Sequence, residues 1–110
     1  MIKIDLKPLS VNGAWQGKRF KTDEYKSYEY SLLMILPKNV VIPEGKLEAF
    51  YRFGFSSVQS DNDNPLKPFQ DVLQKKYDFN DNRIFRTIIE KVIVEKGKEF
   101  IEWEIRALPL

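Results

Sequence analysis

Acidic residues gather in one short polar stretch, Ser60-Asp-Asn-Asp-Asn-Pro65, which Lys67 follows closely. Asp61 and Asp63 are two residues apart where an extended segment ends, and alternate residues of an extended chain point to one side. Two carboxylates on one side repel each other, and a divalent cation relieves that repulsion. Because carboxylate oxygens suit magnesium, which keeps positions open for water and phosphate, we expect a Mg²⁺ site here, with Mn²⁺ as an alternative.

Lys67 and Asp81 complete the candidate chemistry. A lysine beside a carboxylate–metal site can offset the charge on a phosphate in the transition state, and Lys67 follows Asp63 by four residues. Asp81 stands in a later turn, which we expect to return to the same place as a third carboxylate. The set of Asp61, Asp63 and Asp81 as metal ligands, with Lys67 beside them, suits the hydrolysis of phosphodiesters.

The same residues have plainer interpretations, which the sequence leaves open. Asp and Asn before a helix are more often caps than ligands, and Lys67 and Asp71 have the spacing of a helix ion pair. An EF-hand calcium loop fits poorly, because Pro65 and Leu66 stand where that motif needs a ligand and a glycine. If the acidic turn has a structural role instead, one rival hypothesis is a calcium-stabilised interaction domain with no enzymatic activity.

The composition excludes several other chemistries. None of the 110 residues is Cys or His, which rules out disulfides, cysteine nucleophiles and histidine-based triads. Any bound metal would therefore have oxygen ligands. The net charge of +2 is modest, so contacts with nucleic acid must depend on local basic clusters. The candidate DNA contacts are Lys18, Arg19, Lys21, Lys75 and Lys76. No apolar run approaches the roughly 20 residues that span a bilayer, and we expect a cytoplasmic protein without membrane contact.

Hydrophobic spacing predicts the elements that position these residues. Strands are expected at about 2–6, 46–58, 83–95 and 98–107, and helices at about 22–36 and 65–76. Thr22 and Asn64 are suitable N-caps, Pro65 would be the first helical residue, and Pro37 ends the first helix. Lys96-Gly97 predicts a hairpin between the last two strands. On the apolar stripe of the second helix, Phe69 is a core residue or a wedge at the crossover of a DNA junction.

This β-α-β-α-β-β order predicts an α+β fold in which helices pack on a mixed, largely antiparallel sheet. At 110 residues, the chain is expected to form one domain, 1–110.

In combination, these motifs resemble the RusA family of Holliday junction resolvases. The central match is Asp61-x-Asp63-Asn64-x-x-Lys67-x-x-x-Asp71-x-Leu73, followed by Asn80-Asp81-Asn82-x-Ile84 at the start of a strand. The amino-terminal match is Pro8-Leu-Ser-Val-Asn-Gly-Ala-Trp15, then Gly17-Lys-Arg-Phe20 and a helix that contains Tyr25. The resemblance runs in order from about Pro8 to Ile105.

The resemblance implies a structure-selective endodeoxyribonuclease that acts as a homodimer on four-way DNA junctions and nicks two opposing strands. It implies that Asp61, Asp63 and Asp81 hold the metal and that Lys67 is also needed for catalysis. The family often has two adjacent acids at the downstream position, whereas here Asn80 precedes Asp81, and Asp78 is the alternative third ligand.

Asp71 matches a recurrent family position and is expected to ligate the metal or to support the helix and Lys67. Two alternative functions remain beside resolution of junctions. One is a non-catalytic module that binds junctions, and the other is a nuclease that acts on flaps or forks.

Overall fold

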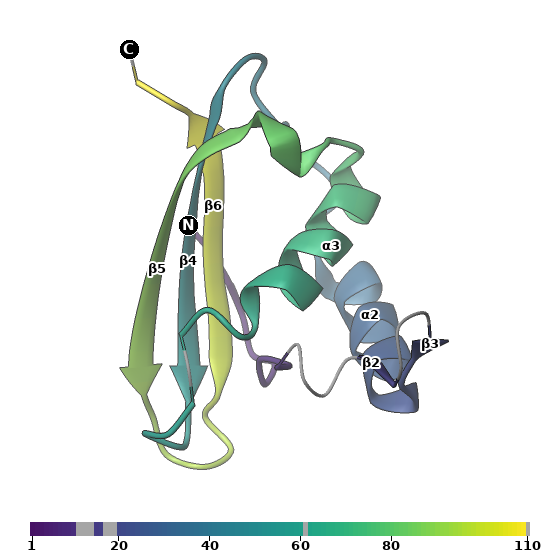
Figure 1. The fold of residues 1–110 in the computed structure, drawn as a ribbon, viewed down its shortest axis with the longest axis vertical. Helices are drawn as coiled ribbons and strands as arrows, with labels where there is room; N and C mark the ends of the chain where they lie inside the picture. Colours follow the sequence, from purple (N-terminus) through teal and green to yellow (C-terminus); the bar gives the residue numbers. More distant parts are fainter. Residues whose placement is uncertain (11–14, 17–19, 61, 110) are drawn as a thin grey trace.

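A four-stranded sheet with two helices on one of its faces forms the centre of the computed structural model (Figure 1). The structure describes residues 1–10, 15, 16, 20–60 and 62–109. The sheet has the order β1-β6-β4-β5. Its strands are β1 (Ile2–Ile4), β4 (Leu47–Phe55), β5 (Ile84–Ile93) and β6 (Phe100–Ala107). The helices are α2 (Asp23–Ile35) and α3 (Leu66–Tyr77), and the 3₁₀ turn η1 (Asp81–Arg83) precedes β5.

The pairing of the strands confirms the predicted α+β fold and its mixed, largely antiparallel sheet. β6 pairs antiparallel with both β1 and β4, whereas β4 and β5 run parallel. A parallel pair needs a long crossover, and α3 supplies it between β4 and β5. The segment predicted as an irregular loop also contains β2 (Trp15–Gln16), which pairs with β3 (Phe20–Lys21).

The predicted hairpin between the last two strands is wrong, because β4 lies between β5 and β6. The expected turn does exist, since Gly97 has φ +93° and the Lys98 N–H donates to the Glu95 carbonyl at 2.9 Å. However, residues 94–99 cross the end of β4 instead of closing a tight hairpin, and the Val94 N–H donates to the Phe55 carbonyl at 2.8 Å. The most buried strand, β4, thereby gains a partner on each edge.

The core lies between the sheet and the helices. Alternate residues of β4 and β6, including Tyr51, Phe53 and Trp103, face α3 and are almost fully buried. Phe69 of α3 is fully buried and packs edge-on against Tyr51, with ring centroids 5.8 Å apart. The interpretation of Phe69 as a core residue is therefore confirmed.

Both helices have nearly the predicted boundaries. α2 begins after Thr22, whose Oγ1 accepts a hydrogen bond from the Tyr25 N–H at 3.1 Å, as predicted. α3 begins one residue later than predicted, at Leu66, because Pro65 is the cap residue rather than the first helical residue. In the described part of the chain, neither helix has the length and apolar character required to cross a membrane.

Candidate functional site

One side of α3 carries four polar residues at three- and four-residue spacing, Lys67, Gln70, Asp71 and Gln74, which we call the α3 polar stripe. Residues at this spacing lie next to one another on a helix surface. The stripe runs beside the buried residues of α3, which hold the helix against the sheet. The core therefore fixes the position of the stripe.

Asp81 follows α3 in the chain but folds back against its middle. The Gln74 Oε1 accepts a hydrogen bond from the Asp81 backbone N–H at 2.7 Å, and the Gln70 Nε2 donates to Asp81 Oδ2 at 3.3 Å. The Tyr51 hydroxyl donates to Gln70 Oε1 at 2.7 Å, which orients the amide so that its nitrogen faces Asp81. Burial, and then the charge of Asp81, raises the pKa of Tyr51, so this hydroxyl remains a donor.

Lys67 and Asp71 form the ion pair that their spacing allows. The Lys67 Nζ lies 3.1 and 3.3 Å from the two carboxylate oxygens of Asp71. The Gln74 Nε2 donates to Asp71 Oδ1 at 3.3 Å, so Gln74 connects Asp71 with Asp81. The Lys67 side chain is 65% exposed, so this pair is a weak one that lets the amine reach other anions.

The structure brings together some of the predicted site residues but not all of them. Lys67, Asp71 and Asp81 belong to one hydrogen-bonded network, whereas Asp61 lies outside the described residues. Asp63 is exposed, and its carboxylate makes no hydrogen bond to another described residue. Asp78, the alternative ligand, is exposed at the end of α3 with φ +52°. Within the described residues, no three acidic side chains are grouped closely enough to hold a metal ion.

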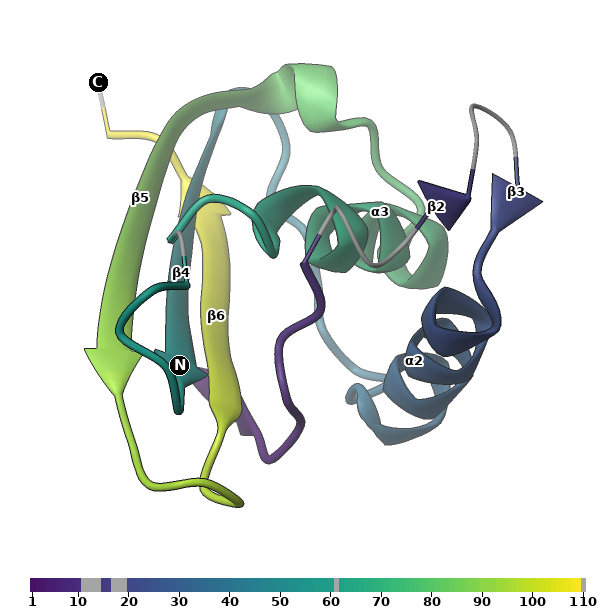
Figure 2. The same ribbon diagram turned by 60° about the horizontal axis from the view of Figure 1, so that its bottom comes forward.

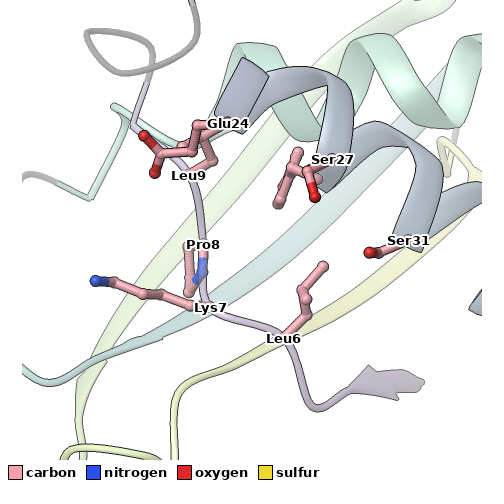
Figure 3. Close-up of a pocket in the computed structure, with 8 residues that line it drawn as sticks. Leu6, Lys7, Pro8, Leu9, Glu24, Ser27 and Ser31 are labelled. Carbon is pink, nitrogen blue, oxygen red and sulfur yellow. The ribbon is translucent and has the colours of Figure 1, made fainter. Parts of the chain in front are cut away.

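A hollow of about 290 Å³ borders the acidic turn and brings together two distant parts of the sequence. Pro8 to Ser10 line one part of it, and Ser60 and Asn64, which flank Asp61 and Asp63, line another. A neighbouring hollow of about 320 Å³ continues along α2. Figure 3 shows the segment from Leu6 to Leu9 beside α2, with the Lys7 amine extending away from the helix. Both blocks that carry the family resemblance therefore border one hollow.

The predicted DNA-binding lysines within the described residues connect α2 with its neighbours, Lys21 from β3 and Lys75 and Lys76 from α3. Lys21 and Lys75 each form an ion pair with Glu29 at 3.0 Å, and the Lys76 amine donates to the Leu33 carbonyl at 2.9 Å. Although burial raises it, the hydrogen bonds from both lysines hold the pKa of Glu29 below its usual value. Lys18 and Arg19 lie outside the described residues. Contact of any of these residues with DNA stays a prediction.

Two glutamines that connect the site were not among the residues predicted from the sequence. Gln70 and Gln74 lie three residues after Lys67 and Asp71, respectively, so helical periodicity alone would have placed them on the same side of α3. Tyr51 carried no such signal, because its hydroxyl faces Gln70 only after the sheet has packed against α3.

Comparison with known proteins adds no family to this description. No protein-family model matches the chain, and no curated protein matches its sequence. The resemblance to the RusA family therefore rests on the motifs quoted above.

Proposed function

We propose that this chain is a metal-dependent endodeoxyribonuclease that resolves four-way DNA junctions. The observation that carries the proposal is the network in which Gln70 and Gln74 hold Asp81 beside Asp71 and Lys67. A carboxylate held in place by neutral amides keeps its charge, which is what binding of a cation requires. The hollow that residues 8–10 line together with Ser60 and Asn64 of the acidic turn gives further support.

The predicted ligands all carry carboxylate oxygens, which suit a hard cation. Asp81 Oδ1 and the Asp63 carboxylate make no hydrogen bond to other described residues, and oxygens of this kind are the ligands that Mg²⁺ prefers. In the proposal, Asp61, Asp63 and Asp81 are the ligands, and Mn²⁺ is an alternative to Mg²⁺. When bound, the cation would lower the pKa of a water molecule and polarise the scissile phosphate.

The chain's own residues supply orientation and charge. Gln70 and Gln74 fix Asp81 against α3, and Tyr51 fixes the amide of Gln70 in turn. The Lys67 side chain is 65% exposed, and its amine would offset negative charge on the phosphate or on the leaving oxygen. Asp71 keeps this amine on the same side of α3 as Asp81.

Branched DNA as the substrate, and a homodimer as the active form, follow from the family resemblance. A junction has near two-fold symmetry, so two identical sites related by a two-fold axis would cut opposing strands. The lysines that contact phosphates would make binding weaker as the salt concentration rises.

The direct test is cleavage of a labelled four-way junction, beside linear duplex of the same sequence, with Mg²⁺ and with EDTA. We expect paired, symmetric nicks that require the metal and that spare the duplex. Asp63→Asn should abolish cleavage and leave junction binding intact, because it removes a ligand without adding bulk.

Each other outcome has a definite meaning. Tight binding without nicks in Mg²⁺ or Mn²⁺ would favour the non-catalytic module, and nicks on flaps or forks in preference to junctions would change the substrate. Neither binding nor cleavage, together with strong thermal stabilisation by Ca²⁺, would favour the interaction domain. Normal cleavage by Asp63→Asn would remove the proposed metal site.

A further inference from the structure

β5 is a long and exposed edge strand. It spans ten residues, none of which is buried, and three of its apolar side chains are well exposed: Phe85 at 62%, Ile88 at 37% and Ile93 at 47%. In both ribbon views no described element lies beyond β5, whereas the opposite edge is the three-residue β1 (Figure 1, Figure 2). Long edges without proline are ready to pair with another strand, and most proteins shorten or cover them.

The backbone of β5 also has free hydrogen-bonding groups on its outer side. The Val94 N–H points inward to the Phe55 carbonyl of β4. Because backbone groups alternate along a strand, those of Thr87, Ile89 and Lys91 point outward, where no described strand pairs with them. The register with β4 is regular from Arg86 to Ile93, so this part of the edge is not interrupted by a bulge.

We propose that β5 pairs antiparallel with β5 of a second copy of this chain, about a two-fold axis centred on Ile88. The charges of the strand are self-complementary about that residue, since Arg86 and Glu90 lie two residues to either side. In this register each Arg86 stands opposite Glu90 of the other copy, and the two Ile88 side chains meet on the axis. All three residues are exposed on the face away from the helices.

The charges select this register over its neighbour. In an antiparallel pair of identical strands, a two-fold axis perpendicular to the sheet passes midway between the two copies of one residue. Ile88 and Ile89 lie at the middle of β5, so they are the two choices for that residue. Centring on Ile89 would place Ile88 opposite Glu90 and Arg86 opposite Val92, which leaves both charges without a partner across the interface. Within each copy, Arg86 already contacts Glu48 and Glu90 contacts Arg52, so the pairs across the interface would extend an existing row of charges.

The assembly would be one eight-stranded sheet, with the helices of both copies on the same face. This surface gives a location to the homodimer in the proposed function, but the inference rests on β5 alone. Its test measures mass and cross-linking rather than cleavage. Loss of cleavage would leave the β5 pairing intact, and a dimer that forms through another surface would overturn the β5 pairing but leave the proposed function intact.

The chain contains no cysteine, so a single introduced cysteine reports on one position. Ile88→Cys would place two thiols opposite each other on the axis, at a separation that a disulfide can span. Ile93→Cys is the matched control, because Ile93 is similarly exposed on the same strand but its two copies would be about 34 Å apart. Under mild oxidation, we expect a reducible dimer from Ile88→Cys and only monomer from Ile93→Cys.

Sedimentation velocity of the unmodified chain over a dilution series should show a monomer–dimer equilibrium. Ile88→Lys should shift it to monomer because two ammonium groups would meet on the axis, while circular dichroism shows that the fold is kept. A monomer at every concentration would overturn the proposal. So would a dimer that Ile88→Lys leaves intact, or equal cross-linking of both cysteine variants.

Discussion

Two carboxylates, Glu48 and Asp81, are held in opposite ways. Glu48 lies on the sheet face away from the helices with a side chain that is only 3% exposed, and it accepts hydrogen bonds at 2.6 Å from both Arg86 and Arg106. The hydrogen bond from Arg106, and then that from Arg86, holds the pKa of Glu48 below its usual value. Asp81 is half-buried, and its described partners are the neutral amides of Gln70 and Gln74.

The difference separates a structural carboxylate from an available one. The two arginines neutralise Glu48, so it has no charge left to offer a ligand and serves to connect β4, β5 and β6. No lysine or arginine within the described residues pairs with Asp81, so the amides fix its position without cancelling its charge. A ligand for a metal ion needs this second arrangement.

The largest effect is expected from Asp81→Asn, which keeps the shape of the side chain and removes its charge. Loss of an outer-shell partner of a metal ligand typically costs about 10–100-fold, and loss of the ligand itself should cost at least as much. We therefore expect Mg²⁺-dependent junction cleavage to fall by about 100-fold or more, with little change in the unfolding temperature.

Asp78→Asn is the matched control for Asp81→Asn. Asp78 is exposed, lies three residues earlier and has a left-handed conformation that Asn also accepts. It should cleave at the normal rate. The reverse pattern, with Asp78→Asn inactive and Asp81→Asn active, would transfer the third ligand to Asp78.

The second effect concerns Gln74, which connects Asp71 to Asp81. Gln74→Leu keeps most of the volume but removes both hydrogen bonds. We expect the Mg²⁺ concentration for half-maximal cleavage to rise by about 10-fold, because Asp81 would no longer be held in place before the cation binds. A variant with lower thermal stability but an unchanged requirement for Mg²⁺ would show that Gln74 has only a structural role.

Patterns in the sequence predicted most of the helices and strands, because these elements depend on residues that are close together in the chain. The strand alternation in β4 and β6 and the cap at Thr22 are properties of a few adjacent residues, and both appear in the structure. The neighbours of a strand are not a local property, which is why the turn at Gly97 predicted a hairpin that does not exist. The turn fixes where the chain reverses, but burial of β4 decides which strands pair.

The charged residues of the candidate site could be predicted from the sequence, but the neutral residues that hold them could not. Acidic and basic residue types pointed to Lys67 and Asp81 on the basis of their chemistry, and the structure joins them through the α3 polar stripe. The partners that hold Asp81 are neutral amides, and neutral residues carry no charge pattern that a search for catalytic groups would detect. The role of Glu48 was missed for another reason: the two arginines that hold it lie on different strands.

A smaller effect, on stability alone, is expected from Glu48→Gln. The substitution removes the charge of a buried carboxylate that two half-exposed arginines share, and within the described residues only Arg106 keeps another ion pair, with Glu104. The unfolding temperature should fall by several degrees while junction cleavage of the folded protein is kept. Glu104→Gln on the same face is the control, because its partly exposed ion pair with Arg106 should contribute little. Equal unfolding temperatures for the two variants would contradict the structural role of Glu48.

The smallest effect is a dependence on pH that arises from Glu29. The pKa of Glu29 is lowered in the folded chain, so its pairs with Lys21 and Lys75 stabilise the fold above its ordinary pKa, near 4.5, and this stabilisation is lost as the pH falls below that value. Glu29→Gln should therefore lower the free energy of unfolding by at most about 1 kcal/mol at neutral pH. That difference should shrink as urea unfolding is repeated at pH values below 4.5. Glu44→Gln, at an exposed loop position, should show no such trend, and a Glu29→Gln difference that stayed constant with pH would mean that the two lysines contribute through packing rather than through their charge.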